Sequence, residues 1–333
     1  MSAFATGVMA YHAYRRPTPP AAPPVLWQEG TTRLFDYGTE KEAGAPLFIV
    51  PSLINRATIL DLTEDRSFCR WFAARGFRPL LVDWDAPGET ERDFDLGDYI
   101  AGRLARALEA ATAATGAPVH VVGYCMGGDL ALALTHLAPD AVRSLSLLAT
   151  PWNFHADAGA KVKTLAAARP QFERTLDALG ELPVDAIQAF FTSLDPYLAA
   201  GKFARFATHA QPSPATDLFV ALEDWLNDGV PLTAGVARDC LVDWYIENKP
   251  AHGGWKVAGR PVIPEEIDTP ALLAIPERDH IVPPASARAL LDALPHAEAL
   301  GVGAGHIGMV AGSRAESGLY RPLHRWLTEI NAG

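Results

Sequence analysis

Cysteine is scarce in this chain of 333 residues, which contains three, Cys69, Cys125 and Cys240, without the spacing of a disulfide framework. An odd number of isolated cysteines argues against a disulfide scaffold and favours a reducing compartment. No apolar run approaches the roughly 20 residues that a transmembrane helix needs. The N-terminus also lacks the basic and apolar regions of a secretion signal. We therefore expect a cytoplasmic protein with no transmembrane segment.

Positive charge is also in short supply, since 28 Lys and Arg face 39 Asp and Glu and the net charge is −11. Nucleic-acid binding needs a concentrated basic surface, and the sequence shows none. The histidines and cysteines do not fall at metal-ligand spacings. There is no glycine-rich phosphate loop followed by Lys and Ser or Thr. We expect no nucleic acid partner, no metal and no bound cofactor.

What the chain does contain is a regular alternation of apolar segments of strand length with longer helical patterns, beginning at Val25. This alternation predicts an α/β fold with a mostly parallel, doubly wound sheet. The strands are expected at Arg33–Tyr37, Leu47–Pro51, Pro79–Asp83, Val119–Gly123, Val142–Leu148, Ala271–Pro276 and Glu298–Val302. The helices between them are expected at Ser67–Arg75, Leu96–Thr115, Met126–Leu137 and Ala285–Leu294.

The chain is expected to divide into three parts. Residues 1–24 form a tail, with a short amphipathic helix at Met1–Tyr14 and five prolines in residues 15–24. A disordered tail is the favoured interpretation, and docking to a partner or hydrophobic surface is the alternative. Residues 25–151 and 269–333 form the core, and residues 152–268 form a helical cap insertion over the carboxyl ends of the strands. The cap helices are expected at Lys161–Ala168, Phe172–Leu179, Val184–Thr192, Ala215–Asn227 and Val236–Tyr245.

The strongest chemical motif is GYCMGG at residues 123–128, between an apolar strand and a helical pattern. This is the strand–turn–helix context of a nucleophile elbow, in which glycines let the chain turn sharply below an exposed nucleophile. The elbow carries Cys125 where serine is common. A cysteine at a helix N-terminus and near a histidine suits thioester chemistry and covalent acyl intermediates. A buried structural cysteine is the alternative for Cys125, and the expected role of Cys69 and Cys240.

A cysteine nucleophile needs a base and an acid that orients it. His306 lies in a glycine-rich loop after the last predicted strand, whereas His120 and His136 fall within a strand and a helix. Asp279 lies between the nucleophile and His306, shortly after an apolar strand. The order Cys125, Asp279, His306 is the order of nucleophile, acid and histidine in α/β-hydrolases. The alternatives for Asp279 are a turn-forming aspartate or replacement by Glu277.

An oxyanion hole needs two backbone N–H donors. The residue after the nucleophile, Met126, normally supplies one of them. The loop PSLIN at residues 51–55, after the predicted strand Leu47–Pro51, occupies the place of the second donor. Leu53 and Ile54 are equal candidates for it.

Taken together, these segments resemble the polyhydroxyalkanoate synthases, in particular the short catalytic subunit of the two-subunit type. The resemblance is carried by the PSLINR and ILDL segments at 51–62, LVDW at 81–84, the elbow at 123–128, DHIVP at 279–283 and GHIG at 305–308, with further similarity at 225–228 and 245–248. It covers the chain from about Val25 to the C-terminus. The large N-terminal domain of the single-subunit synthases is absent, and the start is rich in alanine and proline.

The resemblance implies an α/β-hydrolase fold and an acyltransferase that polymerises (3R)-3-hydroxyacyl-coenzyme A into a polyester. By this resemblance, Cys125 would hold the growing chain as a thioester, His306 would activate the thiol and the incoming hydroxyl, and Asp279 would support His306. The polyester chain or granule surface is the implied partner, and a homodimer or a second synthase subunit stays open. A depolymerase or acyl-coenzyme A thioesterase of the same fold is the main alternative, and a non-catalytic granule-surface protein is the other.

Overall fold

Eight strands form one central sheet in the computed structural model, which describes residues 2–38, 44–194, 198–208 and 212–332. Their order across the sheet is β1–β2–β6–β3–β7–β8–β13–β14. The strands are β1 (Val25–Glu29), β2 (Thr32–Asp36), β3 (Ala45–Val50), β6 (Phe77–Asp83), β7 (Val119–Tyr124), β8 (Val142–Leu148), β13 (Ala271–Pro276) and β14 (Ala297–Val302). From β6 to β14 all neighbours are parallel, and β1 and β2 form an antiparallel edge. The predicted α/β class and its mostly parallel sheet are confirmed.

The order of the strands brings two loops together. The strand β3 lies between β6 and β7, so successive units are wound in opposite directions on its two sides. Parallel strands end at the same edge of a sheet, and the point where the winding reverses leaves the loops after β3 and β7 side by side. These loops contain Leu53 and Cys125 respectively.

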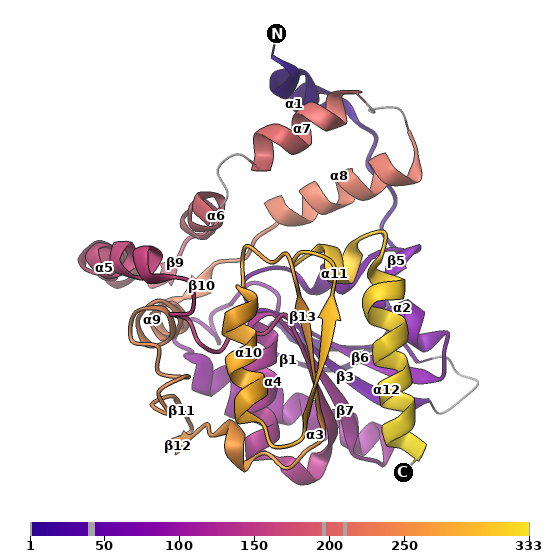
Figure 1. The fold of residues 1–333 in the computed structure, drawn as a ribbon, viewed down its shortest axis with the longest axis vertical. Coiled ribbons are helices and arrows are strands. Elements are labelled where there is room, and N and C mark those ends of the chain that lie inside the picture. The colour runs from indigo at the N-terminus through magenta and orange to yellow at the C-terminus, as the bar shows by residue number, and fades with distance from the viewer. Residues whose placement is uncertain (1, 39–43, 195–197, 209–211, 333) are drawn as a thin grey trace.

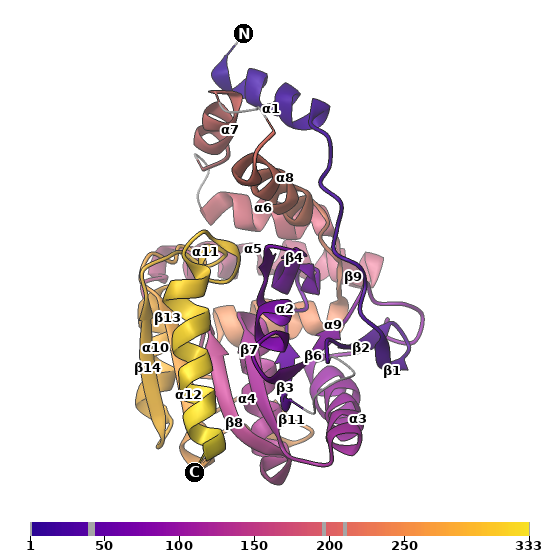
Figure 2. The same cartoon turned by 90° about the vertical axis from the view of Figure 1, so that its right-hand side faces the viewer.

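Helices cover both faces of the sheet (Figure 1). One apolar cluster lies between the sheet and α3 (Ala105–Thr115), α4 (Met126–Leu137) and α10 (Pro284–Ala293). A second lies on the opposite face, under α2 (Phe68–Ala73), α11 (Gly308–Ala311) and α12 (Arg321–Ala332), and Figure 2 shows α12 against that face. Short elements complete the core: η1 (Ala57–Leu60), β4 (Asp61–Thr63), β5 (Arg66–Ser67), η2 (Asp98–Leu104), η3 (Pro139–Ala141), η5 (Pro264–Glu266) and η6 (Glu316–Tyr320).

The predicted core elements agree with the structure except at two places. The predicted helix Leu96–Thr115 is two segments, because η2 is a π-helix that leads into α3. The strand β1 was not predicted. It is a partly exposed edge strand, so it lacks the continuous apolar run that marks the central strands.

A helical cap lies over one end of the sheet (Figure 1). It contains α5 (Gly159–Leu179), α6 (Val184–Leu194), α7 (Leu198–Thr208), α8 (Pro214–Asn227), α9 (Ala234–Arg238) and the π-helix η4 (Asp239–Ile246), with two-residue strands β9 (Glu181–Leu182) and β10 (Leu232–Thr233). The two-residue strands β11 (Lys256–Val257) and β12 (Arg260–Pro261) follow in the same segment and lie lower, beside the core (Figure 1). The two helices predicted on either side of Pro170 are helical in the structure, but the break between them is wrong, because α5 continues through that proline as a single helix. The helix α7 was not predicted. The boundaries at residues 24, 151 and 268 stay predictions.

The N-terminal segment is not the disordered tail that the sequence favoured. Residues 3–13 form the helix α1 (Ala3–Ala13), which lies beside α7 at the far end of the molecule (Figures 1 and 2). The Tyr14 hydroxyl donates a 2.8 Å hydrogen bond to Asp217, and Arg16 forms a 2.9 Å ion pair with Asp224 of α8. These contacts order the tail against the cap. Neither α1 nor any other described helix has the length and apolar character to cross a membrane.

Candidate active site

Cys125 lies at a sharp turn between β7 and α4. Its backbone has φ of 55° and ψ of −130°, a conformation that residues other than glycine rarely adopt. The Cys125 N–H donates a 2.8 Å hydrogen bond to the Leu148 carbonyl, and the Gly128 N–H donates one of 2.8 Å to the Cys125 carbonyl. The strain is thus held by hydrogen bonds on both sides. Conformations of this kind concentrate at active sites, where the fold compensates for them.

Glycines of the elbow allow α4 to approach the sheet and the loop after β3. A Cβ atom at Gly127 would lie 2.2 Å from the Val50 carbonyl oxygen, and one at Gly123 would lie 2.4 Å from the Gly128 Cα. A Cβ atom at Gly128 would lie 1.8 Å from the Thr150 hydroxyl oxygen. Real side chains do not tolerate such contacts, so the glycines set the position of Cys125 relative to the β3 loop.

Replacing Gly127 with alanine is therefore expected to destabilise the protein by about 3 kcal/mol, since overpacking of this kind costs roughly 1–3 kcal/mol and here the clash is with rigid backbone. The matched control is Gly201→Ala in α7, where a Cβ atom would meet nothing within 4 Å. That change is expected to stabilise by about 0.5–1 kcal/mol, because alanine favours helix. Urea unfolding of the two variants tests this. Equal effects would contradict the close approach of α4 to the β3 loop.

Asp279 and His306 form a buried, hydrogen-bonded pair. The His306 Nδ1 atom lies 2.7 Å from Asp279 Oδ2, and both side chains are almost fully buried. The other carboxylate oxygen of Asp279 accepts N–H groups of Ile281 at 2.8 Å and Val282 at 2.9 Å. Asp279 thus forms a local turn and contacts His306 at the same time. Glu277, the alternative acid, is exposed, and no hydrogen bond or ion pair with His306 is found for it among the described residues.

The environment of His306 favours its charged form. Burial by itself disfavours the imidazolium, but the charge of Cys125 and hydrogen bonds with Asp279 and Cys125 outweigh it and raise the pKa of His306 from 6.5 to about 10. Because Nδ1 contacts Asp279, the other ring nitrogen is the one that can face Cys125. This environment suits an imidazole that takes up and holds the proton of a thiol nucleophile.

This environment predicts a change in the titration of His306. In Cys125→Ala the largest cause that raises its pKa is lost, so the pKa of His306 is expected to fall clearly below the value of about 10. Histidine NMR shifts followed against pH measure it, with Cys69→Ala as the control that leaves the titration unchanged. Since the folded-state pKa exceeds 6.5, the protonated imidazole stabilises the fold below pH 6.5, and this contribution is lost as the pH rises towards 10. An unaltered titration of His306 in Cys125→Ala would contradict the pairing of His306 with Cys125.

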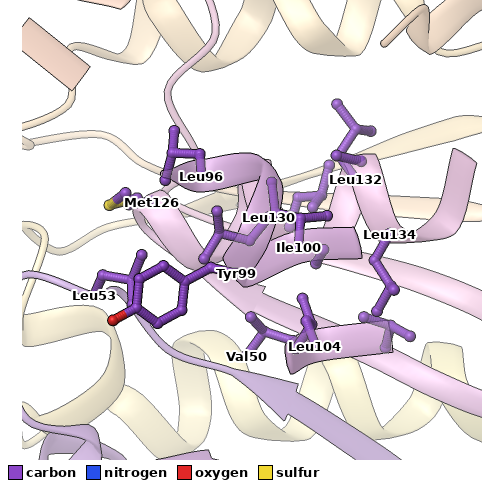
Figure 3. Close-up of a cluster of buried hydrophobic side chains, with 14 of the residues drawn as sticks. Val50, Leu53, Leu96, Tyr99, Ile100, Leu104, Met126, Leu130, Leu132 and Leu134 are labelled. Carbon is purple, nitrogen blue, oxygen red and sulfur yellow. The ribbon is translucent and has the colours of Figure 1, made fainter. Parts of the chain in front are cut away.

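The predicted oxyanion-hole donors differ in whether their backbone N–H groups are already hydrogen-bonded. Met126 is the first residue of α4, so its N–H has no partner within the helix. The Ile54 N–H donates to the Ser52 hydroxyl at 3.1 Å. No hydrogen bond of the Leu53 N–H is found within the described residues. Leu53 is therefore the better candidate, and Figure 3 shows its side chain in the same buried cluster as Met126.

The loop after β3 is anchored from two directions. The Trp84 indole N–H donates a 3.0 Å hydrogen bond to the Pro51 carbonyl, which ties the loop to the core. The Trp225 indole N–H of α8 donates one of 2.8 Å to the Arg56 carbonyl, which ties it to the cap. A backbone amide held in this way costs little reorganisation when charge develops beside it.

The other histidines and cysteines singled out from the sequence lie away from this pair or are buried in the core. His120 is fully buried and contacts the Ser144 hydroxyl at 2.7 Å and the Asn331 side chain at 2.9 Å. Cys69 and Cys240 are both buried and free. Among the described residues, no group of three or more His, Cys, Asp or Glu side chains is placed to hold a metal ion.

Sequence reasoning missed two tyrosines near Cys125. The Tyr124 hydroxyl donates a 3.2 Å hydrogen bond to the His306 carbonyl, and its ring lies 5.3 Å from the imidazole. Tyr245, in η4 of the cap, is close enough to Cys125 that its charge adds to the effect of burial in raising the pKa of the phenol. Their positions depend on tertiary packing, although Tyr245 falls in a segment that resembles the synthases.

A mostly apolar pocket lies between the Asp279 loop and the cap. Its wall includes Ile281 and Val282, whose N–H groups bind Asp279, together with Tyr245 from η4. The other residues that line it are Pro151, Asn153, Phe154, Ala156, Asp157, Ala158, Val162, Leu165, Phe190, Pro283 and Ser286. Such a pocket suits an aliphatic chain, because its wall is mostly apolar and offers few polar groups that could fix the position of a ligand.

Two family models match the chain. The model described as alpha/beta hydrolase fold matches residues 62–312, about three quarters of the sequence. The model described as the N-terminus of poly-beta-hydroxybutyrate polymerase (PhaC) matches residues 21–72. The second match contains the PSLINR and ILDL segments.

Curated relatives resemble nearly the whole chain. The poly(3-hydroxyalkanoate) polymerase subunit PhaC of Haloferax mediterranei is 29% identical over 311 residues, which are 92% of this chain and 63% of that protein. The subunit of the same name from Allochromatium vinosum is 29% identical over 315 residues, 91% of this chain and 87% of that protein. The chain thus spans under two thirds of the first relative and most of the second.

Solved structures share the fold at low sequence identity. A thioesterase domain from the curacin biosynthetic pathway has a TM-score of 0.51 and 15% identity, covering 87% of this chain and 95% of that one. The enol-lactonase of Burkholderia xenovorans LB400 has a TM-score of 0.50 and 16% identity, covering 91% and 97%. At such identities the likeness establishes the fold alone.

Proposed function

Because the chain belongs to the α/β-hydrolase fold family and is a relative of the poly(3-hydroxyalkanoate) polymerases, we propose that it polymerises (3R)-3-hydroxyacyl-coenzyme A into a polyester. The observation that carries the proposal is Cys125 in a strained elbow, beside a His306 ring that is bound to a buried Asp279. A thiol nucleophile with this support suits exchange between thioesters.

In the first step, His306 takes the proton of the Cys125 thiol, and the Cys125 sulfur attacks the thioester carbonyl of the substrate. A carbon–sulfur bond forms to Cys125, and the negative charge on the carbonyl oxygen is stabilised by the N–H groups of Met126 and Leu53. The bond to coenzyme A then breaks, and the departing thiolate takes the proton that His306 carries. Asp279 keeps the imidazole oriented throughout.

In the second step, the 3-hydroxyl of a further substrate attacks the acyl group on Cys125. His306, now neutral, accepts the hydroxyl proton as the new ester bond forms, and the Cys125 sulfur leaves. The extended chain, still a coenzyme A thioester, can return to Cys125 by the first step. The apolar pocket beside Tyr245 and Val282 supports this proposal, because it offers a place for an aliphatic chain next to the Asp279 loop.

A hydrolase would use the same first step and differ only in resolving the acyl-enzyme with water. Purified chain is therefore incubated with (3R)-3-hydroxybutyryl-coenzyme A, and free thiol, insoluble polyester and free 3-hydroxybutyrate are measured separately. Thiol release with polyester is the expected result. Release with free acid alone would overturn polymerisation and identify a thioesterase. The absence of release, with or without a synthase partner subunit from a relative, would overturn the proposed substrate.

A further inference from the structure

Asp129 differs from the other buried carboxylates of the described chain in having no partner. Glu91 binds Arg103 at 2.6 Å, Glu223 binds Lys202 at 2.7 Å, and Asp279 contacts His306. Asp129 has no exposed surface, and neither of its carboxylate oxygens has a hydrogen-bond partner in another described residue. Buried polar groups are nearly always paired, so an unpaired one calls for an explanation.

The position of Asp129 relates it to the nucleophile. It lies in the first turn of α4, four residues after Cys125. Side chains on a helix lean towards its N-terminus, so a residue covers the turn that precedes it. Asp129 is therefore directed back towards Cys125. Asp129 is also close enough to Cys240 and Tyr245 in η4 to influence the pKa of both, which places the carboxyl between the start of α4 and the cap.

The chemical state of Asp129 follows from this burial. Desolvation raises the pKa of its carboxyl well above the usual range, and the charge of Cys125 raises it further. A neutral carboxylic acid has one O–H donor and a carbonyl acceptor. It is therefore suited to a ligand group that both donates and accepts a hydrogen bond, such as an alcohol.

We propose that Asp129 binds the hydroxyl on carbon 3 of the acyl group carried by Cys125, and so selects 3-hydroxyacyl thioesters over unsubstituted ones. The proposal rests on the proposed function. The acyl carbonyl carbon is bonded to the Cys125 sulfur, and the hydroxyl oxygen lies three bonds further along the chain. Four residues of helix rise about 6 Å. The part of the acyl group between the Cys125 sulfur and the hydroxyl oxygen can span this distance. An acyl group without the hydroxyl would leave Asp129 unpaired, which is how enzymes reject analogues that lack a polar group.

The experiment compares (3R)-3-hydroxybutyryl-coenzyme A with butyryl-coenzyme A, which lacks only the hydroxyl. Single-turnover release of coenzyme A gives kcat/KM of acylation for each. Asp129→Leu removes the hydrogen-bonding groups at similar size, and Asp129→Asn keeps a donor and an acceptor. Thr135→Val is the matched control, because Thr135 is a buried polar residue of the same helix whose hydroxyl bonds to the Ala131 carbonyl. If Asp129→Leu fails to fold by circular dichroism, Asp129→Ala replaces it.

In Asp129→Leu, kcat/KM for the hydroxylated substrate is expected to fall roughly tenfold, while that for butyryl-coenzyme A stays the same. Asp129→Asn and Thr135→Val should keep the preference of the wild type. An equal fall for both substrates would show that Asp129 only positions Cys125, and no change would show that it binds an ordered water; either result overturns the inference and leaves the proposed function standing. A wild type that releases coenzyme A from neither substrate would overturn both.

Discussion

Replacing Cys125 with alanine is expected to lower the rate of coenzyme A release from (3R)-3-hydroxybutyryl-coenzyme A by about four orders of magnitude. Removal of a nucleophile that acts as a unit with its base typically costs a factor of roughly 10⁴–10⁶. The oxyanion-hole amides would remain, but no acyl-enzyme could form. The rate is measured with a thiol reagent, and the alanine variant is checked for folding by circular dichroism.

The matched control for this experiment is Cys69→Ala. Cys69 is a buried core residue of α2, on the opposite face of the sheet from α4. Its replacement should leave the rate of acylation unchanged and lower only the stability of the fold. The assignment of the nucleophile would be wrong if Cys125→Ala retained more than a tenth of the wild-type rate. It would also be wrong if Cys69→Ala lowered the rate by as large a factor as Cys125→Ala.

His306→Gln is expected to lower coenzyme A release by roughly a thousandfold or more. Glutamine can still hydrogen-bond to Asp279, but it can neither hold the proton that the leaving thiolate needs nor accept one from the incoming hydroxyl. The alkylation rate of Cys125 by iodoacetamide should fall in parallel, because glutamine cannot take the proton of the Cys125 thiol. Peptide mass spectrometry identifies the alkylated cysteine.

The control here is His120→Gln. His120 is as buried as His306, but its ring nitrogens contact Ser144 and Asn331 rather than a nucleophile. This variant should unfold at a lower temperature and keep the alkylation rate of Cys125. Full reactivity of Cys125 in His306→Gln would refute the assignment of His306 as the base.

The elements around the candidate site could be predicted because their determinants are local. The bounds of α4 agree with the prediction, since the elbow glycines precede a clear helical pattern. Asp279 follows the buried apolar strand β13, His306 follows its neighbour β14 at the edge of the sheet, and the carboxyl ends of parallel strands meet at one edge of the sheet. The choice between Leu53 and Ile54 could not be made from sequence, because it depends on whether Ser52 accepts one of their N–H groups.

The cap and the N-terminal segment were harder to predict because their structure depends on packing. Pro170 was expected to end a helix, yet α5 continues through it. The helix α1 was expected in a disordered tail, yet Gly7 allows it to lie directly on the backbone of Phe203 in α7, where a Cβ atom would come within 1.9 Å of the carbonyl oxygen. Asp129 was not singled out from the sequence, because its complete burial is a property of the folded structure.

The measurement that tests the central claim most directly is mass spectrometry of the chain, acid-quenched within one turnover of (3R)-3-hydroxybutyryl-coenzyme A and digested with a protease. The account predicts that the peptide containing Cys125 carries a hydroxybutyryl group, or short oligomers of it, and that hydroxylamine removes the added mass as expected for a thioester. Release of coenzyme A with an unmodified Cys125, or with the acyl group on another residue, would contradict it.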